Sequence, residues 1–148
     1  EEIRAKVYHL VDTECVEYIE KLFAQYLLDD QNFDYSPVLL HADVSPEHII
    51  YDSKAQDVVG VIDFGDVEIG DPAYDLMYLY KDYGKWFIDA YLKIFPHKDS
   101  ERLLKKVVFF RKRNTVHDVL LGVYRNDEIL LQWALENLRR EVKEFKKS

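Results

Sequence analysis

The sequence predicts an α+β fold that is mostly helical, with a small β element in the first half of the chain. Three observations support this prediction. The chain has 148 residues, 48% of them hydrophobic, which is enough for one folded domain with a buried core. Apolar residues recur at helical spacing over most of the chain, whereas residues 38–64 form short runs rich in Val and Ile. Because a two-stranded ribbon is marginal alone, we expect it to lie on helices.

The first predicted helix covers about residues 13–28, with Thr13 as its N-cap. Its apolar and aromatic residues share one face: Val16, Ile19, Leu22, Phe23, Tyr26 and Leu27. Cys15, the only cysteine of the chain, lies in the same segment. Without a second cysteine no disulfide can form within the chain, so we expect Cys15 to have no redox role and the compartment to be reducing and cytoplasmic.

Two short strands are predicted next, "HIIYD" at residues 48–52 and "VVGVID" at residues 58–63. The polar loop 53–57 between them predicts an antiparallel hairpin. Pairing Asp52 with Val58 gives a constant sum of 110 for the residue numbers of cross-strand partners. This register places His48 opposite Ile62.

The remaining chain predicts helices. Asp71 and Pro72 form a start signal, with Asp71 as N-cap and Pro72 at the first helical position. Further helices are predicted at about residues 84–95, 99–123 and 126–146. The last two carry apolar stripes formed by Leu103, Val107 and Phe110, and by Leu130, Ala134, Leu138, Val142 and Phe145.

The hairpin register brings polar side chains together. His48 lies beside Asp63 at one end of the ribbon, and Asp43 precedes His48 by five residues, so the same end can collect all three. One imidazole and two carboxylates could bind a divalent cation and orient a nucleophile. An Asp–His hydrogen bond that only stabilises the hairpin explains the spacing equally well.

Net charge limits the partners. The formal charge of −8 argues against general affinity for nucleic-acid backbones or anionic membranes, because both need a cationic face. No apolar run reaches the roughly 18 residues that span a bilayer, and the N-terminal "EEIRAKVYHL" is too charged for a signal peptide. We therefore predict a soluble protein with neither nucleic acid nor membrane as partner. A cationic ligand would suit the acidic chain, although solubility alone also explains the charge.

Two motifs resemble those of a known enzyme superfamily. The segment "HADVSPEHII" (41–50), followed by "VIDFGD" (61–66), resembles the catalytic loop and metal-binding motif of kinase-like phosphotransferases. Within that superfamily the chain is most similar to aminoglycoside phosphotransferases that act on the 2''-hydroxyl, and "GDPAYDL" (70–76) fits their pattern. The resemblance covers roughly residue 10 to the end. It implies the C-terminal lobe of a protein-kinase-like fold, in which a short β-hairpin carries the metal ligands.

The resemblance also implies an activity and roles for residues. The activity is transfer of the γ-phosphate of a nucleoside triphosphate, ATP or GTP, to an aminoglycoside hydroxyl, which confers antibiotic resistance. Asp43 would be the catalytic aspartate that orients the attacking hydroxyl, and Asp63 the principal Mg2+ ligand. His48 would be the second metal ligand, at a position where most relatives have asparagine, although imidazole is a borderline ligand for Mg2+. His41 matches the motif histidine that braces the loop.

Parts of a complete kinase-like enzyme are not found in the sequence. There is no glycine-rich loop and no lysine-bearing strand of the V-A-I-K type, and the first 35 residues read as helical and acidic. We therefore expect residues 1–148 to be the C-terminal, acceptor- and metal-binding lobe of a longer protein whose N-terminal nucleotide lobe is missing. The isolated chain is then expected to be inactive.

Acidic residues suggest how a cationic substrate would bind. Residues 57–89 contain eight carboxylates and two lysines, and aminoglycosides are polyamines that such carboxylates attract. We expect Asp66 and Glu68 to contact the substrate, and Asp71 and Asp75 to be structural. Trp133 is a further candidate for the acceptor site, because an indole face can stack on a sugar ring; a helical tryptophan is otherwise a core residue.

Two alternatives stay open. A choline-kinase-like or homoserine-kinase-like enzyme would share both motifs, and the 11 tyrosines could form the aromatic cage that a quaternary ammonium needs. A kinase-like lobe that has lost catalysis and serves as a binding module is the other alternative. The presence of both Asp43 and Asp63 argues against such a loss.

Overall fold

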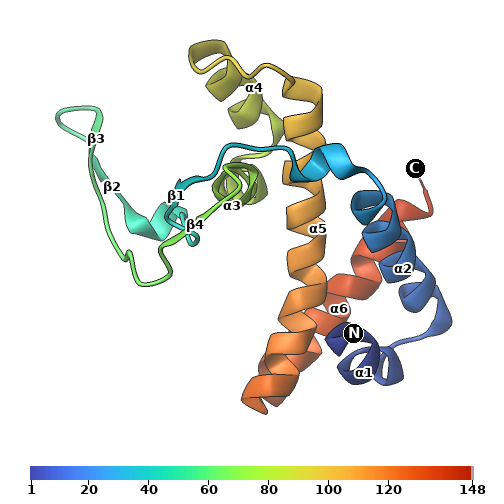
Figure 1. Cartoon of the computed structure of the whole chain (residues 1–148). Helices are drawn as coiled ribbons and strands as arrows, with labels where there is room; N and C mark the ends of the chain where they lie inside the picture. The colour runs from blue at the N-terminus through green and yellow to red at the C-terminus, as the bar shows by residue number, and fades with distance from the viewer. Residues whose placement is uncertain (148) are drawn as a thin grey trace. The chain divides into compact units, whose positions relative to one another are not determined.

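The computed structural model of the protein describes residues 1–147, which form six α-helices and two short antiparallel β-ribbons (Figure 1). This confirms the predicted, mostly helical α+β class. The chain divides into two compact units, the first made of residues 1–31 and the chain from Lys112 onward, the second of residues 32–111. None of the helices within residues 1–147 has the length and apolar character needed to cross a membrane.

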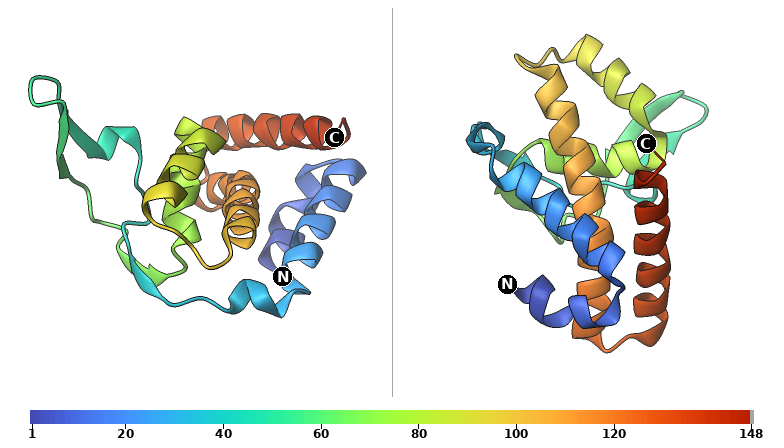
Figure 2. Two further views of the ribbon diagram at one scale, coloured as in Figure 1. Left: turned by 90° about the horizontal axis from the view of Figure 1, so that it is seen from above. Right: turned by 90° about the vertical axis from the view of Figure 1, so that its right-hand side faces the viewer.

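The first unit is helical. It contains α1 (Glu2–Lys6), α2 (Thr13–Leu27), the C-terminal half of α5 (Ser100–Arg125) and α6 (Glu128–Phe145). α2 and α6 lie against this half of α5 (Figure 2), and the three helices share one apolar core. The predicted stripe of α6 supplies Ala134, Leu138 and Val142 to that core.

The α2 helix differs from its prediction in two details. Its N-cap is Asp12, whose carboxylate accepts the backbone N–H of Cys15 at 2.9 Å, and not Thr13, because a carboxylate one residue earlier reaches the free amides of the first turn. The core-facing side contains Ile19, Leu22 and Phe23 of the predicted stripe and adds Cys15 and Tyr18, while Leu27 at the far end of the stripe is 57% exposed.

The second unit holds both β-ribbons. The first pairs β1 (Val38–Leu40) with β4 (Glu68–Gly70), and the second pairs β2 (Ile49–Asp52) with β3 (Asp57–Val61). The β2–β3 hairpin extends away from α3 (Ala73–Tyr83) and α4 (Lys85–Ile94), as Figure 1 shows. These two helices and the N-terminal half of α5 form the second core, made of Ala73, Leu76, Met77, Ile88, Leu103 and Val107.

The predicted register of the β2–β3 hairpin is correct at one end and wrong at the other. Ile49 pairs with Val61, which keeps the predicted sum of 110, but Asp52 pairs with Asp57 and not with Val58. A bulge after Ile50 inserts one extra residue into β3, and this shifts the register only toward the turn. At the other end the Ile62 N–H donates to the His48 carbonyl at 2.9 Å.

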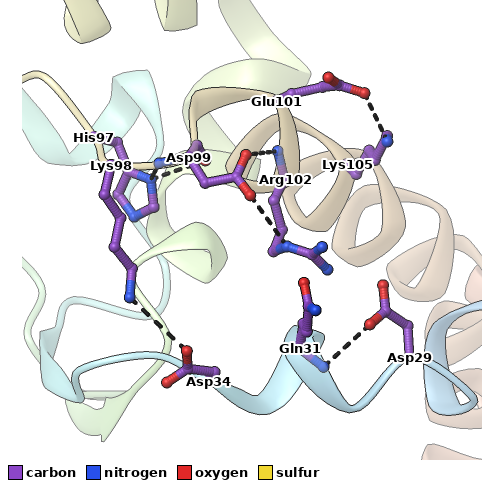
Figure 3. Close-up of polar contacts among 9 residues, drawn as sticks. All are labelled: Asp29, Gln31, Asp34, His97, Lys98, Asp99, Glu101, Arg102 and Lys105. Carbon is purple, nitrogen blue, oxygen red and sulfur yellow. Dashed lines mark hydrogen bonds and ion pairs between the residues drawn. The ribbon is translucent and has the colours of Figure 1, made fainter.

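Short polar contacts hold the segment before α5 (Figure 3). Asp99 accepts the backbone N–H of Arg102 at 2.9 Å and its Nε at 3.2 Å, so it caps the helix. Lys98 lies 3.8 Å from Asp34, and Lys105 pairs with Glu101 on the exposed side of α5.

Candidate active site

Two backbone segments form the candidate site, the loop 41–48 that joins β1 to β2, and residues 62–66 after β3. Each contains a non-glycine residue in the left-handed region, Ala42 with φ 63° and Asp63 with φ 63°. Such conformations cost about 1–3 kcal/mol each and persist only where surrounding contacts hold them. Both residues lie inside the two motifs, which makes these segments candidates for function.

His41 connects the two segments. Its Nε2 lies 2.8 Å from the Ile62 carbonyl, and since a carbonyl only accepts, Nε2 carries the proton. The unprotonated Nδ1 then accepts the backbone N–H of Asp43 at 3.3 Å. The ring is buried and packs on Phe64, with ring centroids 4.7 Å apart. The structure thus places His41 where it holds the backbone of Asp43 and the residue before Asp63.

His48 lies between the two aspartates. Its Nδ1 donates to the Asp43 carbonyl at 2.6 Å, and its Nε2 lies 3.5 Å from Asp63 Oδ2. The Asp43 carboxylate is 3.8 Å from the same Nδ1. The pKa of His48 is raised, first by the hydrogen bond to the Asp43 carbonyl and then by the negative charges of Asp43 and Asp63. The structure therefore brings together the three side chains that the hairpin register groups.

The donor chemistry of this cluster fits a magnesium ion held partly by substrate. Because Nδ1 of His48 donates to a backbone carbonyl, a neutral ring presents the Nε2 lone pair toward Asp63, which is the usual orientation of a metal-binding histidine. The Asp63 carboxylate is 65% exposed. Within residues 1–147 no group of three or more His, Cys, Asp or Glu side chains could hold a metal ion. Magnesium commonly takes one or two protein carboxylates, with phosphates and water completing its shell.

Asp75, on α3, holds the loop 41–48. Its two carboxylate oxygens accept the backbone N–H groups of His41 and Ala42, at 2.9 Å and 2.8 Å. These bonds support the left-handed backbone of Ala42. Asp75 was predicted only to be structural. Its place in "GDPAYDL" was the one available signal for this contact, which spans 34 residues of sequence.

The three residues predicted to contact the substrate lie in different segments of the chain. Asp66 is exposed in the connection between β3 and β4, and Glu68 begins β4 opposite Leu40, which directly precedes His41. Trp133 lies on α6 in the first unit and is 52% exposed, so it is not a core residue.

Tyr78 on α3 was not predicted. The pKa of its hydroxyl is raised by burial first, by a hydrogen bond with Tyr74 second, and further by the charges of Asp43 and Asp66. The Tyr78 hydroxyl on α3 therefore lies within the negative field of both carboxylates. An aromatic residue on an amphipathic helix gives no sequence signal for such a position.

Comparisons with known proteins point to one family. A family model described as the phosphotransferase enzyme family matches residues 2–107. No curated protein matches the chain significantly. The GDP complex of aminoglycoside 2'-phosphotransferase-IIIa is 29% identical, with a TM-score of 0.89, over 97% of this chain and 48% of that chain.

Two further solved structures are similar. An APH(2'') enzyme with GDP and kanamycin is 31% identical, with a TM-score of 0.87, over 95% of this chain and 48% of that chain. A gentamicin complex of APH(2'')-IIa is 28% identical, with a TM-score of 0.74, over 93% of this chain and 48% of that chain. The chain thus spans about half the length of these solved structures.

Proposed function

Because the chain belongs to the phosphotransferase enzyme family, we propose that it is the acceptor- and metal-binding lobe of an enzyme that phosphorylates an aminoglycoside hydroxyl. One observation carries the proposal. Asp43, His48 and Asp63 converge at one end of the hairpin, in a fold shared with aminoglycoside phosphotransferases at about 30% identity. The activity would confer resistance to the antibiotic.

Asp43 orients the acceptor in this proposal. Its carboxylate is 42% exposed, while its backbone is fixed on both sides, by His41 at the N–H and by His48 at the carbonyl. A side chain that is free to contact substrate on a fixed backbone suits a group that accepts or directs the proton of an attacking hydroxyl. The loose transition state of phosphoryl transfer depends mainly on such positioning.

Asp63 and His48 would hold Mg2+, with Asp63 as the principal ligand. When bound, the ion would neutralise charge on the phosphate oxygens of the nucleotide. His48 serves as a ligand only when its Nε2 is unprotonated, so its raised pKa opposes metal binding at acidic pH.

The donor and the acceptor are proposed from relatives and from charge. Solved relatives were obtained with GDP, ATP or ADP, and with kanamycin, gentamicin or streptomycin, in two cases with nucleotide and aminoglycoside together. We extend to this chain a nucleoside triphosphate, ATP or GTP, as donor and a cationic aminoglycoside as acceptor. Asp66 and Glu68 are the proposed contacts for its ammonium groups, and Trp133 a proposed stacking surface.

A further lobe is proposed because the chain spans 48% of its solved relatives and exposes many apolar side chains near the ribbons. The exposed residues of this region are Val38, Leu39, Ile50, Tyr51, Val58, Val59, Val61, Ile62, Phe64, Val67 and Ile69. An exposed apolar surface of this kind marks an interaction site. We assign it to an N-terminal nucleotide lobe, without which the 148-residue chain is expected to be inactive and prone to associate.

A substrate panel with the complete protein tests the proposal. Kanamycin, gentamicin, choline and homoserine are each incubated with Mg2+ and either ATP or GTP, and products are detected by mass spectrometry. We expect phosphorylated kanamycin or gentamicin, and no phosphorylated choline or homoserine. Phosphorylation of choline or homoserine alone would replace the aminoglycoside as acceptor. No phosphorylated product with any compound would support the non-catalytic module.

A further inference from the structure

The second unit contains a buried ion pair that the proposed function does not use. Lys106 of α5 is 5% exposed and its Nζ pairs with Asp71 Oδ2, which is also buried. The same ammonium lies 4.6 Å from the ring centroid of Tyr35. Two buried charges carry a large desolvation cost, so this pair needs a reason beyond stability.

Lys106 joins three chain segments at one place. Tyr35 precedes β1 and Asp71 directly follows β4, and Val38 pairs with Gly70 at that end of the β1–β4 ribbon. The catalytic loop begins at the opposite end of the ribbon, where Leu40 precedes His41. Lys106 therefore holds the end of the ribbon that is remote from the loop.

Asp71 also fixes the start of α3. Its Oδ1 accepts the backbone N–H of Ala73 at 3.0 Å, and its carbonyl accepts that of Tyr74 at 2.9 Å. One helical turn later, Asp75 accepts the N–H groups of His41 and Ala42. A shift of the helix start would move the Asp75 carboxylate relative to these two amides.

We infer that Lys106 is a positioning residue for the catalytic loop. It acts through Asp71 and the first turn of α3 on the two hydrogen bonds that Asp75 accepts from the loop, here called the Asp75 clamp. The inference rests on the proposed function only in that the loop carries Asp43. Lys106 touches neither substrate nor reacting atoms in this account. Its contribution is to keep the Asp75 carboxylate within hydrogen-bond distance of the loop amides.

Residue-resolved hydrogen–deuterium exchange on the complete protein tests this. In Lys106→Met we expect the His41 and Ala42 amides to exchange at least about tenfold faster relative to the Ile88 amide, because their opening no longer requires loss of the whole core. Lys105→Met is the matched control. It removes the same charge from the next residue of α5, where Lys105 is 72% exposed and pairs with Glu101 on the surface.

Because Lys106→Met leaves the buried Asp71 carboxylate unpaired, which opposes folding, the double variant Asp71→Asn/Lys106→Met is measured in parallel. It removes the buried charge, and the same selective increase at the two loop amides is expected. An equal change at His41, Ala42 and Ile88, or no change at the loop amides, in the folded variants would overturn the inference.

A kinetic measurement separates this inference from the proposed function. If the complete protein phosphorylates an aminoglycoside, Lys106→Met should lower kcat with little change in KM for the acceptor, and an effect confined to KM would contradict positioning. If it phosphorylates none, the proposed function fails while the exchange result still decides the role of Lys106.

Discussion

Replacing Asp75 by Asn tests how the loop 41–48, the proposed catalytic loop, is held. Asp75 uses both carboxylate oxygens to accept N–H groups of the loop, at 2.9 Å from His41 and 2.8 Å from Ala42. An asparagine keeps one acceptor and turns an NH2 group toward the other N–H. One charge-assisted hydrogen bond is lost, one becomes neutral, and one backbone N–H is left without its acceptor.

The expected magnitude follows from these contacts. A hydrogen bond to a charged group contributes about 1.5–3 kcal/mol, and an unsatisfied buried donor costs about 1–3 kcal/mol. The backbone of Ala42 is in the strained left-handed region, with φ 63°, so it favours relaxation of the loop once its N–H is released. We expect these two hydrogen bonds to weaken by about 3 kcal/mol in total, which corresponds to a roughly hundredfold smaller equilibrium constant for the positioned loop.

The assay measures kcat for kanamycin phosphorylation by the complete protein, together with thermal unfolding. Asp75→Asn should lower kcat by up to about a hundredfold. Asp82→Asn, an exposed change on the same helix, serves as the control and should leave kcat unchanged. Turnover of Asp75→Asn equal to that of Asp82→Asn would refute the reasoning that the clamp positions the loop.

Three further predictions concern the Cys15 thiol, the contact between α5 and α6 at Gly122, and the binding of gentamicin. Burial raises the pKa of Cys15 to about 11, so at pH 8 only about 0.1% of the thiol is ionised; iodoacetamide labelling should be slow in native buffer and rapid in denaturant, and equal rates would contradict this. A Cβ at Gly122 would lie 2.8 Å from Leu131 Cα; Gly122→Ala should therefore lower the free energy of unfolding by about 1–2 kcal/mol despite the better helix propensity of alanine, and a raised Tm would contradict the close helix contact. Calorimetric titration of the 148-residue chain with gentamicin should show weak binding that falls as salt rises, because exposed charge pairs are screened over about 8 Å at physiological ionic strength; heat that is indifferent to salt and to Asp66→Asn, or no heat at low salt, would contradict the acidic contact.

Local patterns were sufficient to predict most of the helices. The helix expected at residues 84–95 is found at Lys85–Ile94, and the one expected at 126–146 is found at Glu128–Phe145. In each helix the apolar residues at helical spacing pack into the core of its own unit, the second core for α4 and the first for α6, so the period in the sequence and the buried face agree. The α2 helix shows the limit of this argument, because packing against α5 and α6 also buries Cys15 and Tyr18, which lie outside the predicted stripe.

The candidate site was predicted where it depends on register, and missed where it depends on distant partners. His48 and Asp63 converge as the index sum of 110 requires, because the bulge after Ile50 lies beyond them toward the turn. The bonds of Asp75 to the catalytic loop and the burial of Lys106 against Asp71 join segments more than 30 residues apart. Neither periodicity nor spacing indicates which distant backbone groups or charges a side chain will meet.

The most direct test of the proposed phosphotransfer is the turnover of Asp43→Asn in the complete protein. The substitution leaves the backbone contacts of Asp43 with His41 and His48 in place, so the variant should fold and bind aminoglycoside nearly as well as the original. Transfer of labelled γ-phosphate to kanamycin is measured under saturating conditions. We expect kcat to fall by at least about a hundredfold with little change in the Kd for kanamycin. Near-normal turnover would contradict the account, because Asp43 would then not be the group that orients the acceptor.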